Sequence, residues 1–358
     1  MSGGVDSSVA AAILAAEGHE VIGLFMRLGH QPVSGVERSR GCCSARDADD
    51  ARRVAGILGI PFYSLNFEEE FGRIVDDFAG EYARARTPNP CVRCNQWLKF
   101  GRLLETAREL GAEAVATGHY VRRVDREGSL ALARARDLSK DQSYYLFALG
   151  PGEIAAARFP VGDLEKSKVR EVAREHGFPN ADKPESQDIC FVPDGDYRPV
   201  VQAVRPDSFR PGEIRDTSGR LLGTHSGVAA FTIGQRRGVG VAAGHPLYVV
   251  ELDAETNTVV VGTRDELARG GLLAAGVLWT TGQVPAPGTE LRCAAQVRYN
   301  HRPGDCTVRM DASGGAEVLF DRPESAVTPG QAVVFYEGDV VLGGGWIDSA
   351  LPVAVRSR

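Results

Sequence analysis

The sequence lacks a long hydrophobic run, an excess of positive charge and an even set of cysteines. No stretch reaches the roughly 18 consecutive apolar residues that a transmembrane helix requires, so no membrane span is predicted. The net charge of −6 gives the chain no overall attraction for nucleic acid, so any RNA binding must depend on local basic groups. The candidate groups are Arg84/Arg86, Arg122/Arg123/Arg126, Arg134/Arg136/Lys140, Lys166/Lys168/Arg170, Arg236/Arg237 and Arg298/Arg302. For any one of these groups alone, a solvated charged surface is the simpler interpretation.

The seven cysteines are Cys42, Cys43, Cys91, Cys94, Cys190, Cys293 and Cys306. Their odd number argues against the disulfide scaffold of a small secreted protein, so we expect a cytoplasmic protein with a few chemically employed thiols. Neighbouring side chains diverge, so the adjacent pair Cys42 and Cys43 is predicted to be buried rather than chelating. Cys293 and Cys306 lie in a β-rich region and are predicted to be structural.

The N-terminal half alternates strands with helices. At 358 residues, with 43% apolar and 25% charged residues, the chain has room for two or three globular domains. We expect strands at 20–26, 61–66 and 114–117 and helices at 9–16, 47–58 and 100–110. This order predicts an α/β domain with a doubly wound parallel sheet, whose ligands bind beyond the carboxyl ends of the strands.

After about residue 194 the pattern changes to short β-prone runs separated by Gly and Pro. Examples are 247–250, 258–261, 296–299, 306–309, 316–320 and 332–336. We therefore expect a catalytic domain over 1–194, a small β-rich central domain over 195–264 and an antiparallel β-barrel over 265–358.

An anion-binding loop is predicted at the N-terminus, over Ser2-Gly3-Gly4-Val5-Asp6-Ser7-Ser8. Two glycines allow close backbone approach, and the following apolar helix directs its positive N-terminal end at the same anion. No lysine follows the glycines, which excludes the GxxxxGK[ST] phosphate loop. Such a loop is normally preceded by a buried strand, whereas only Met1 precedes it here, so we expect Met1 to be an internal methionine of a longer chain.

A Cys-x-x-Cys pair, Cys91 and Cys94, precedes a distant third cysteine, Cys190, in the segment 186–191. Two thiols at this spacing either bind one metal ion or exchange as a redox pair. A zinc site would need a fourth ligand, and the sequence offers no second pair. Metal binding and redox chemistry therefore both stay open at this point.

The loop resembles that of the ATP pyrophosphatase superfamily, and nearly the whole chain resembles the bacterial tRNA-specific 2-thiouridylases. The matching segments are MSGGVDSS at 1–8, RTPNP at 86–90, CN at 94–95, KF at 99–100, ATGHY at 116–120, KDQSYYL at 140–146, FPVG at 159–162, ICF at 189–191, GQRRG at 234–238 and VTPGQ at 327–331. The resemblance implies an enzyme that uses ATP with magnesium to adenylate O2 of the wobble uridine and then replaces it with sulfur. It also implies tRNA substrates of the Lys, Glu and Gln types and a sulfur donor such as a cysteine desulfurase or a sulfur-relay protein.

The resemblance assigns roles to individual residues. Cys190 would carry a persulfide, and Cys94 would resolve it through a transient Cys94–Cys190 disulfide. The ATP-binding positions implied are Met1, Ser2, Gly3, Gly4, Val5, Asp6, Ser7, Ser8, Met26 and Gly118. The tRNA-contacting positions implied are Asn89, Pro90, Cys91, His119, Lys140, Asp141, Gln142, Arg298, Tyr299 and Gln331.

One position departs from the pattern, because many relatives have Asp where this chain has Cys91. A third thiolate allows Cys91, Cys94 and Cys190 to hold a 4Fe-4S cluster with one open iron, as an alternative to the persulfide route. Two other functions stay open: an ATP-dependent synthetase of small molecules, and a tRNA-binding relative without catalysis. A synthetase would need neither a cysteine trio nor a tRNA-facing barrel. The missing first strand supports the binding protein, because the loop would then be unanchored.

Overall fold

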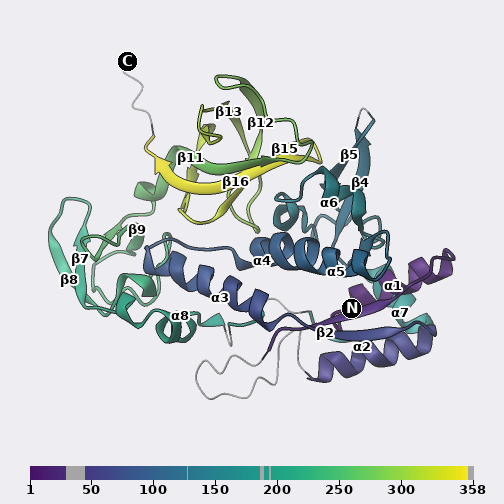
Figure 1. Cartoon of the computed structure of the whole chain (residues 1–358). Coiled ribbons are helices and arrows are strands. Elements are labelled where there is room, and N and C mark those ends of the chain that lie inside the picture. Colours follow the sequence, from purple (N-terminus) through teal and green to yellow (C-terminus); the bar gives the residue numbers. More distant parts are fainter. Residues whose placement is uncertain (30–44, 127, 186–188, 193–194, 354–358) are drawn as a thin grey trace.

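The computed structural model describes residues 1–29, 45–126, 128–185, 189–192 and 195–353 (Figure 1). Cys42 and Cys43, and the prediction that they are buried, lie outside the described residues. The α/β part forms one end of the molecule, the central β-rich part forms the other, and the barrel lies above the helices that connect them (Figure 1). Within the described ranges, no helix is long and apolar enough to span a membrane.

The α/β part contains two parallel strand pairs surrounded by helices. Its elements are α1 (Val5–Ala16), β1 (Gly23–Arg27), α2 (Ala45–Leu58), β2 (Phe62–Asn66), α3 (Glu68–Ala83), α4 (Pro90–Arg93), a π-helix (Cys94–Arg102), α5 (Leu103–Glu109), β3 (Val115–Ala116), α6 (Pro151–Ala156), β6 (Ala157–Arg158) and α7 (Lys166–Glu175). β1 pairs with β2 and β3 pairs with β6, both in parallel. The strand expected at 20–26 begins only at Gly23, and the amino group of Met1 donates to the carbonyl of Leu24 beside it.

Helices cover both faces of these strands, as expected for a doubly wound sheet. Leu24 and Met26 pack against a core formed by α3, the π-helix and α5. The side chain of Phe25 points to the other face, because side chains alternate along a strand. A second core, between α1, α2 and α7, contains Val9, Val54 and Val169.

The helix expected at 100–110 is part of a longer helical segment that begins at Pro90. Asn89 caps this segment by accepting a hydrogen bond from the backbone N–H of Val92, and proline favours the first helical position. The segment passes through a π-helix from Cys94 to Arg102 before it continues as α5. π-Helical turns are rare and concentrate at functional sites.

The central part is a four-stranded sheet, and the C-terminal part is a closed barrel. The sheet has the order β8 (Leu221–His225), β7 (Gly212–Asp216), β10 (Thr258–Gly262) and β9 (Tyr248–Asp253). The barrel has the order β11 (Ala268–Trp279), β14 (Ala316–Ser325), β13 (Gly304–Met310), β12 (Glu290–Gln296), β15 (Ala332–Glu337) and β16 (Val340–Leu351), and β16 pairs again with β11. α8 (Arg198–Val204) packs against α3 and joins the central part to the α/β part. The antiparallel barrel confirms the expectation, whereas the strand expected at 296–299 ends at Gln296.

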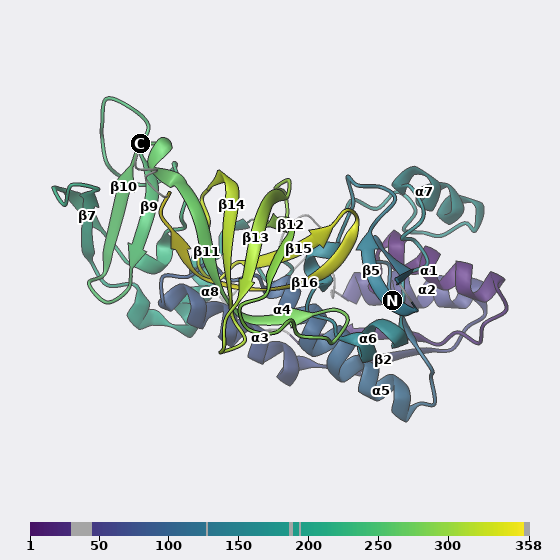
Figure 2. The same ribbon diagram turned by 90° about the horizontal axis from the view of Figure 1, so that it is seen from above.

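A hairpin of the α/β part extends the barrel sheet. β4 (Val121–Arg126) and β5 (Ser129–Arg134) form this hairpin, and β5 pairs with β16 at Ala133 and Val340. The view from above shows β5 beside the end of β16 (Figure 2). One hydrophobic core unites Val121 and Leu132 of the hairpin with Val334 and Val341 of the barrel. The barrel is therefore packed directly on the part of the molecule that carries the N-terminal loop.

Candidate active site

The N-terminal loop is held in a defined conformation by its own hydroxyl groups. Ser7 Oγ donates to the carbonyl of Gly4 at 3.1 Å and accepts from the backbone N–H of Ser2 at 3.1 Å. Gly3 adopts φ +73°, and a Cβ atom there would lie 2.4 Å from the carbonyl oxygen of Asp47. Only glycine fits this position, because a side chain would need both a left-handed conformation and space that α2 occupies.

Two side chains, the buried Asn180 and the partly buried Lys183, brace the loop from behind. The amide of Asn180 donates to the carbonyl of Gly3 at 3.1 Å and to Ser8 Oγ at 2.9 Å. The ammonium of Lys183 contacts the same Gly3 carbonyl at 3.1 Å and pairs with Asp47 at 2.6 Å. Because Asn180 and Lys183 both hold the Gly3 carbonyl, the loop is anchored without a ligand.

Gly118 brings the end of β3 against this loop. A Cβ atom at Gly118 would lie 2.5 Å from both the carbonyl carbon of Asp6 and the backbone nitrogen of Ser7. The strand end and the first turn of α1 are thus in direct backbone contact. Met26 lies near the carboxyl end of β1, the other strand end expected to face the ligand.

Asp6 lies at the centre of a charged cluster. Lys166 Nζ is 2.7 and 2.9 Å from its two carboxylate oxygens and 2.9 Å from Glu185 Oε1. Tyr120 donates its hydroxyl to Asp6 at 2.8 Å, and Lys140 donates to Glu185 at 2.7 Å. Burial and the charge of Asp6 raise the pKa of Tyr120, so its phenol stays protonated and keeps donating. Burial works against ionisation of Glu185, but hydrogen bonds from Lys140 and Lys166 outweigh it and lower its pKa.

Lys166 corrects one expectation, because its side chain is only 11% exposed and pairs inward. It therefore does not form a surface patch with Lys168 and Arg170. Arg134 is similarly enclosed, since its guanidinium pairs with Asp141 at 3.0 Å.

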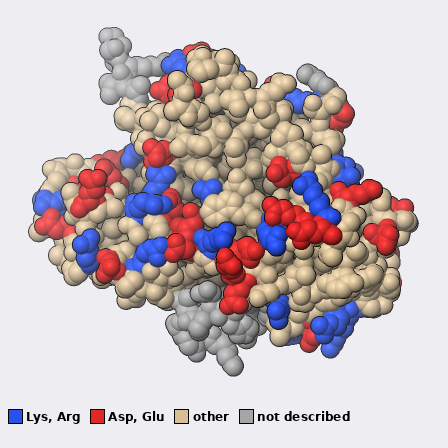
Figure 3. All heavy atoms as spheres, viewed as in Figure 1, with Lys and Arg blue, Asp and Glu red and all other residues tan. Residues whose placement is uncertain are grey.

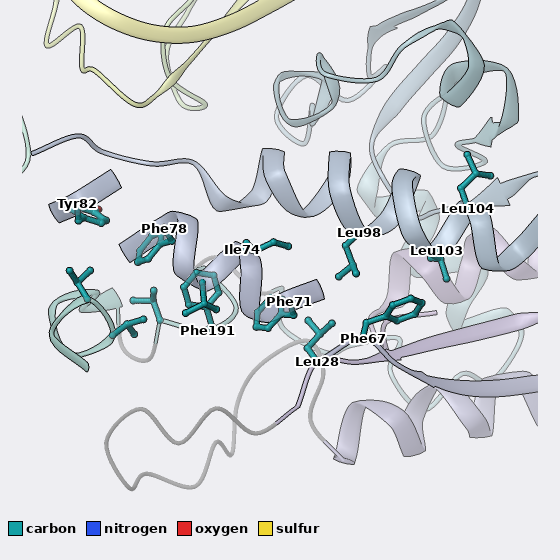
Figure 4. Packing of buried hydrophobic residues seen from close by; sticks show 14 of the residues in the cluster. Leu28, Phe67, Phe71, Ile74, Phe78, Tyr82, Leu98, Leu103, Leu104 and Phe191 are labelled. Carbon is teal, nitrogen blue, oxygen red and sulfur yellow. The ribbon is translucent and has the colours of Figure 1, made fainter. Parts of the chain in front are cut away.

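Cys94 and Cys190 both border the core that packs against α3. Leu98, one helical turn after Cys94, is fully buried in this core. Phe191, which follows Cys190, contacts the rings of Phe71 and Phe78 edge-on at centroid distances of 5.6 and 5.0 Å. Figure 4 shows Phe191 lying beneath α3 between these two rings, with Leu98 on the helix above. The structure thus brings both thiol-bearing segments to one hydrophobic cluster.

Cys91 lies near a different part of the chain, the segment 143–146. Burial raises the pKa of Tyr145, and the charge of Cys91 raises it further. Asn95, one turn after Cys91, donates its amide to the carbonyl of Tyr145 at 3.1 Å. The described residues, which include Cys91, Cys94 and Cys190, contain no group of three or more His, Cys, Asp or Glu side chains placed to hold a metal ion.

Several predicted tRNA-contacting residues are engaged within the protein. Asp141 accepts hydrogen bonds from Arg134 and Ser143, and Gln142 accepts one from the backbone N–H of Tyr120. Tyr299 stacks on Tyr145 with ring centroids 4.5 Å apart. Burial raises the pKa of Tyr299, and the charges of Asp141, Glu185 and Cys91 raise it further. Tyr299 is consequently within electrostatic reach of both the Asp6 cluster and the Cys91 helix.

His119 is buried, and its ring is oriented by two neighbours. Thr117 Oγ1 lies 2.8 Å from Nδ1, and Lys99 Nζ lies 3.4 Å from Nε2. Because an ammonium can only donate, Nε2 accepts and Nδ1 carries the proton. Burial, with the nearby charge of Lys99, lowers the pKa of His119 well below its usual value, so the ring is neutral at pH 7.

The barrel contacts the chain just before α4. Gln331 Nε2 donates to the carbonyls of Thr87 and Pro88, both at 3.1 Å. Gly330, at φ +90°, packs so closely that a Cβ atom would lie 2.9 Å from the backbone of Thr87. The guanidinium of Arg93 lies 3.9 Å from the ring centroid of Trp346 on β16. The barrel thus positions the segment that leads into Asn89 and α4.

Sequence reasoning missed the side chains that support the loop, which are Tyr120, Lys166, Asn180, Lys183 and Glu185. Lys166, Lys183 and Glu185 are ordinary charged residues in sequence, and only the fold shows that they converge from distant segments. One signal was present, since Tyr120 and Lys166 lie in or close after the matching segments 116–120 and 159–162.

Comparisons with known proteins agree with this architecture. Residues 1–194 match the family model described as tRNA methyl transferase HUP domain, 200–263 the tRNA methyl transferase PRC-barrel domain, and 269–347 the aminomethyltransferase beta-barrel domain. The chain is 53% identical to tRNA-specific 2-thiouridylase MnmA of Geobacter metallireducens, covering 98% of this chain and 96% of that protein. It is 49% identical to the protein of the same name from Geotalea uraniireducens (98% and 94% covered) and 47% identical to that of Moorella thermoacetica (99% of both covered).

The loop and the α/β fold define a HUP-domain protein of the type that uses ATP. With nearly full-length similarity to the curated relatives, the chain belongs to the family of tRNA-specific 2-thiouridylases.

Proposed function

We propose that the protein is a tRNA-uridine 2-sulfurtransferase, which uses ATP to replace O2 of the wobble uridine with sulfur and releases AMP and pyrophosphate. The observation that carries the proposal is the direct link between the loop and the thiol-bearing helix. Tyr120 donates to Asp6 of the loop at 2.8 Å, and the adjacent His119 lies 3.4 Å from Lys99, on the helical segment that carries Cys91 and Cys94. A nucleotide on the loop and a base beside the thiols would therefore lie within reach of each other.

In the first step, uridine O2 attacks the α-phosphorus of ATP, an O2–P bond forms and pyrophosphate leaves. The backbone N–H groups at the start of α1 would bind the phosphates, since the first turn of a helix has unpaired donors and a positive dipole end. Lys166, which reaches Asp6 and Glu185, would neutralise charge that develops on the leaving pyrophosphate.

Magnesium, when bound, would supply further positive charge to the phosphates. Asp6 is the loop carboxylate available to it, but both oxygens of Asp6 are paired with Lys166.

In the second step, the terminal sulfur of a Cys190 persulfide attacks C2, and O2 leaves as part of AMP. The Cys94 thiolate then attacks Cys190 Sγ, which releases the thiolated base and closes a Cys94–Cys190 disulfide. The placement of both cysteines at one core supports this pairing. Cys91 lies instead beside Tyr145, which favours persulfide chemistry over a 4Fe-4S cluster that would need all three thiols. A thiol reductant and a sulfur donor, such as a cysteine desulfurase or relay protein, would restore the enzyme in the cytoplasm.

The cysteine assignment is tested with four matched variants. Cys94→Ser and Cys190→Ser are expected to lose 2-thiouridine formation in tRNA, measured by mass spectrometry of digested nucleosides. Cys293→Ser and Cys306→Ser, which alter barrel thiols, are expected to retain it. Wild-type levels of 2-thiouridine with Cys190→Ser would refute the assignment, provided that circular dichroism shows all four variants folded.

The choice of tRNA is part of the same proposal. By resemblance we expect the Lys, Glu and Gln tRNAs to be substrates, with Asn89, Pro90 and Cys91 beside the target base. Transcripts of these three tRNAs should gain sulfur, whereas a transcript with a different wobble base should not.

A further inference from the structure

Two cysteines face each other across the β12–β13 hairpin of the barrel. Cys293 and Cys306 are direct partners in the antiparallel register. Their Sγ atoms are 3.7 Å apart and are not bonded. Side chains directly opposite each other in such a pair have Cβ atoms about 4.5–5.5 Å apart, close to the roughly 3.5–4.5 Å of a disulfide. A small inward movement of the two strands would let the sulfurs join.

The two thiols differ in their exposure to solvent. Cys306 is fully buried in the barrel core, whereas Cys293 is half-buried at the edge of that core. Hydrogen bonding with Cys293, together with burial, raises the pKa of the Cys306 thiol. A dissolved oxidant therefore reacts first with Cys293, because Cys306 is buried and its thiol stays protonated.

We propose that Cys293 and Cys306 form a redox modification site, which closes to a reversible disulfide when the protein meets a peroxide. Cys293 first attacks hydrogen peroxide, the O–O bond breaks, and a sulfenic acid and one water are formed. Cys306 Sγ then attacks the sulfenic sulfur, an S–S bond forms, and the hydroxyl leaves as a second water with the Cys306 proton. Both thiols are oxidised and one peroxide is reduced. A thiol reductant then reduces the disulfide back to two thiols by thiol–disulfide exchange.

The disulfide would link the two strands next to the loop that carries Arg298 and Tyr299. β12 ends at Gln296, whose amide donates to the carbonyls of Arg298 and Tyr299 at 3.1 and 2.7 Å. A link between the strands would restrict how far this loop can separate from Tyr145, on which Tyr299 stacks. Any effect on tRNA depends on the function proposed above, whereas formation of the disulfide does not.

Peptide mapping tests the proposal directly. Native protein is treated with hydrogen peroxide, alkylated with iodoacetamide after denaturation and digested with trypsin. Cleavage after Arg292, Arg298 and Arg309 separates Cys293 in 293–298 from Cys306 in 299–309, because Pro303 protects Arg302. The expected product is a linked pair lighter by two hydrogens than its two free peptides, and dithiothreitol should remove it.

Two sets of variants complete the test. The linked pair should persist in protein carrying Cys94→Ser and Cys190→Ser, and in Cys293→Ser the buried Cys306 should resist oxidation. Recovery of the two peptides only as separate alkylated or over-oxidised species would overturn the proposal. A link that forms only when Cys190 is present would also overturn it, because the oxidising group would then be the sulfur-transfer site rather than peroxide. Neither result depends on tRNA or ATP.

Discussion

Lys166 is the enclosed cation that the structure places against Asp6 of the N-terminal loop. It is enclosed and joins Asp6 to Glu185, so replacing it removes the cation beside the expected phosphate position. Lys166→Met should lower the rate of AMP formation by about 10²–10³-fold, the usual effect of losing one group that stabilises developing charge. Lys166→Arg should retain part of the rate because it keeps the charge.

The matched control is Lys168→Met on the same helix, since Lys168 is about half exposed and pairs with Glu171 in its own turn. AMP release and ATP affinity are measured for all three proteins. Wild-type AMP formation by Lys166→Met would contradict the role given to the ammonium group, whereas an equal loss in Lys168→Met would point to damage of α7.

At the residue scale, sequence predicted the parts of the site that form contiguous motifs. The serines and glycines of residues 2–8 are readable because loop and helix are adjacent in the chain. Lys166, Asn180 and Lys183 are not, since each reaches the loop from more than 150 residues away through a packed fold. Lys166 was interpreted as part of a basic patch because charge alone does not show which face of a helix is buried.

The barrel loop 329–331 is the element that supports the start of α4 from outside. Gln331 satisfies two carbonyls at Thr87 and Pro88, just before the Asn89 cap. Gln331→Ala would leave these carbonyls without their donor, at a cost of about 1–3 kcal/mol if they stay buried. We expect a lower turnover of thiolation with little change in tRNA affinity.

Gln283→Ala, in an exposed turn of the barrel, is the matched control and should leave both quantities unchanged. The resemblance instead suggests that Gln331 touches tRNA directly. If Gln331→Ala weakened tRNA binding and left turnover of bound tRNA intact, direct contact would explain the residue and the positioning role would be wrong.

Element boundaries followed the hydrophobic pattern wherever one face is buried. β13, with Cys306, Val308 and Met310 facing the core, runs over 304–310 and includes the strand expected at 306–309. The helix from Pro90 was missed because Cys91 to Arg102 mixes polar and apolar residues, and a π-helix shifts the 3.6-residue period on which such a prediction depends. The strand expected at 296–299 failed because the side chain of Gln296 turns the backbone through its own hydrogen bonds.

The whole molecule carries a net charge of −6, yet the tRNA that we propose as its substrate is itself a polyanion. Figure 3 shows acidic and basic side chains interleaved on the face it presents, without one continuous basic field. Local arginines would then neutralise the phosphates, and counterion release predicts that tRNA affinity falls steeply as salt rises. Arg298→Ala should weaken tRNA binding and reduce the salt dependence while leaving ATP affinity unchanged.

Arg309→Ala removes an exposed arginine of the same barrel that is already paired with Glu290, and it should have little effect. Titrations between low and physiological ionic strength provide the comparison. A flat salt dependence in the wild type would contradict the local-group explanation.

The central claim is that ATP activates uridine O2 so that sulfur can replace it. It is tested most directly with a tRNA whose wobble uridine carries ¹⁸O at position 2, incubated with the enzyme, ATP and a persulfide donor. The account predicts one AMP for each 2-thiouridine formed, and that AMP carries the ¹⁸O in its phosphate, because O2 leaves bonded to phosphorus. Formation of 2-thiouridine without ATP, or with AMP that contains no ¹⁸O, would contradict it.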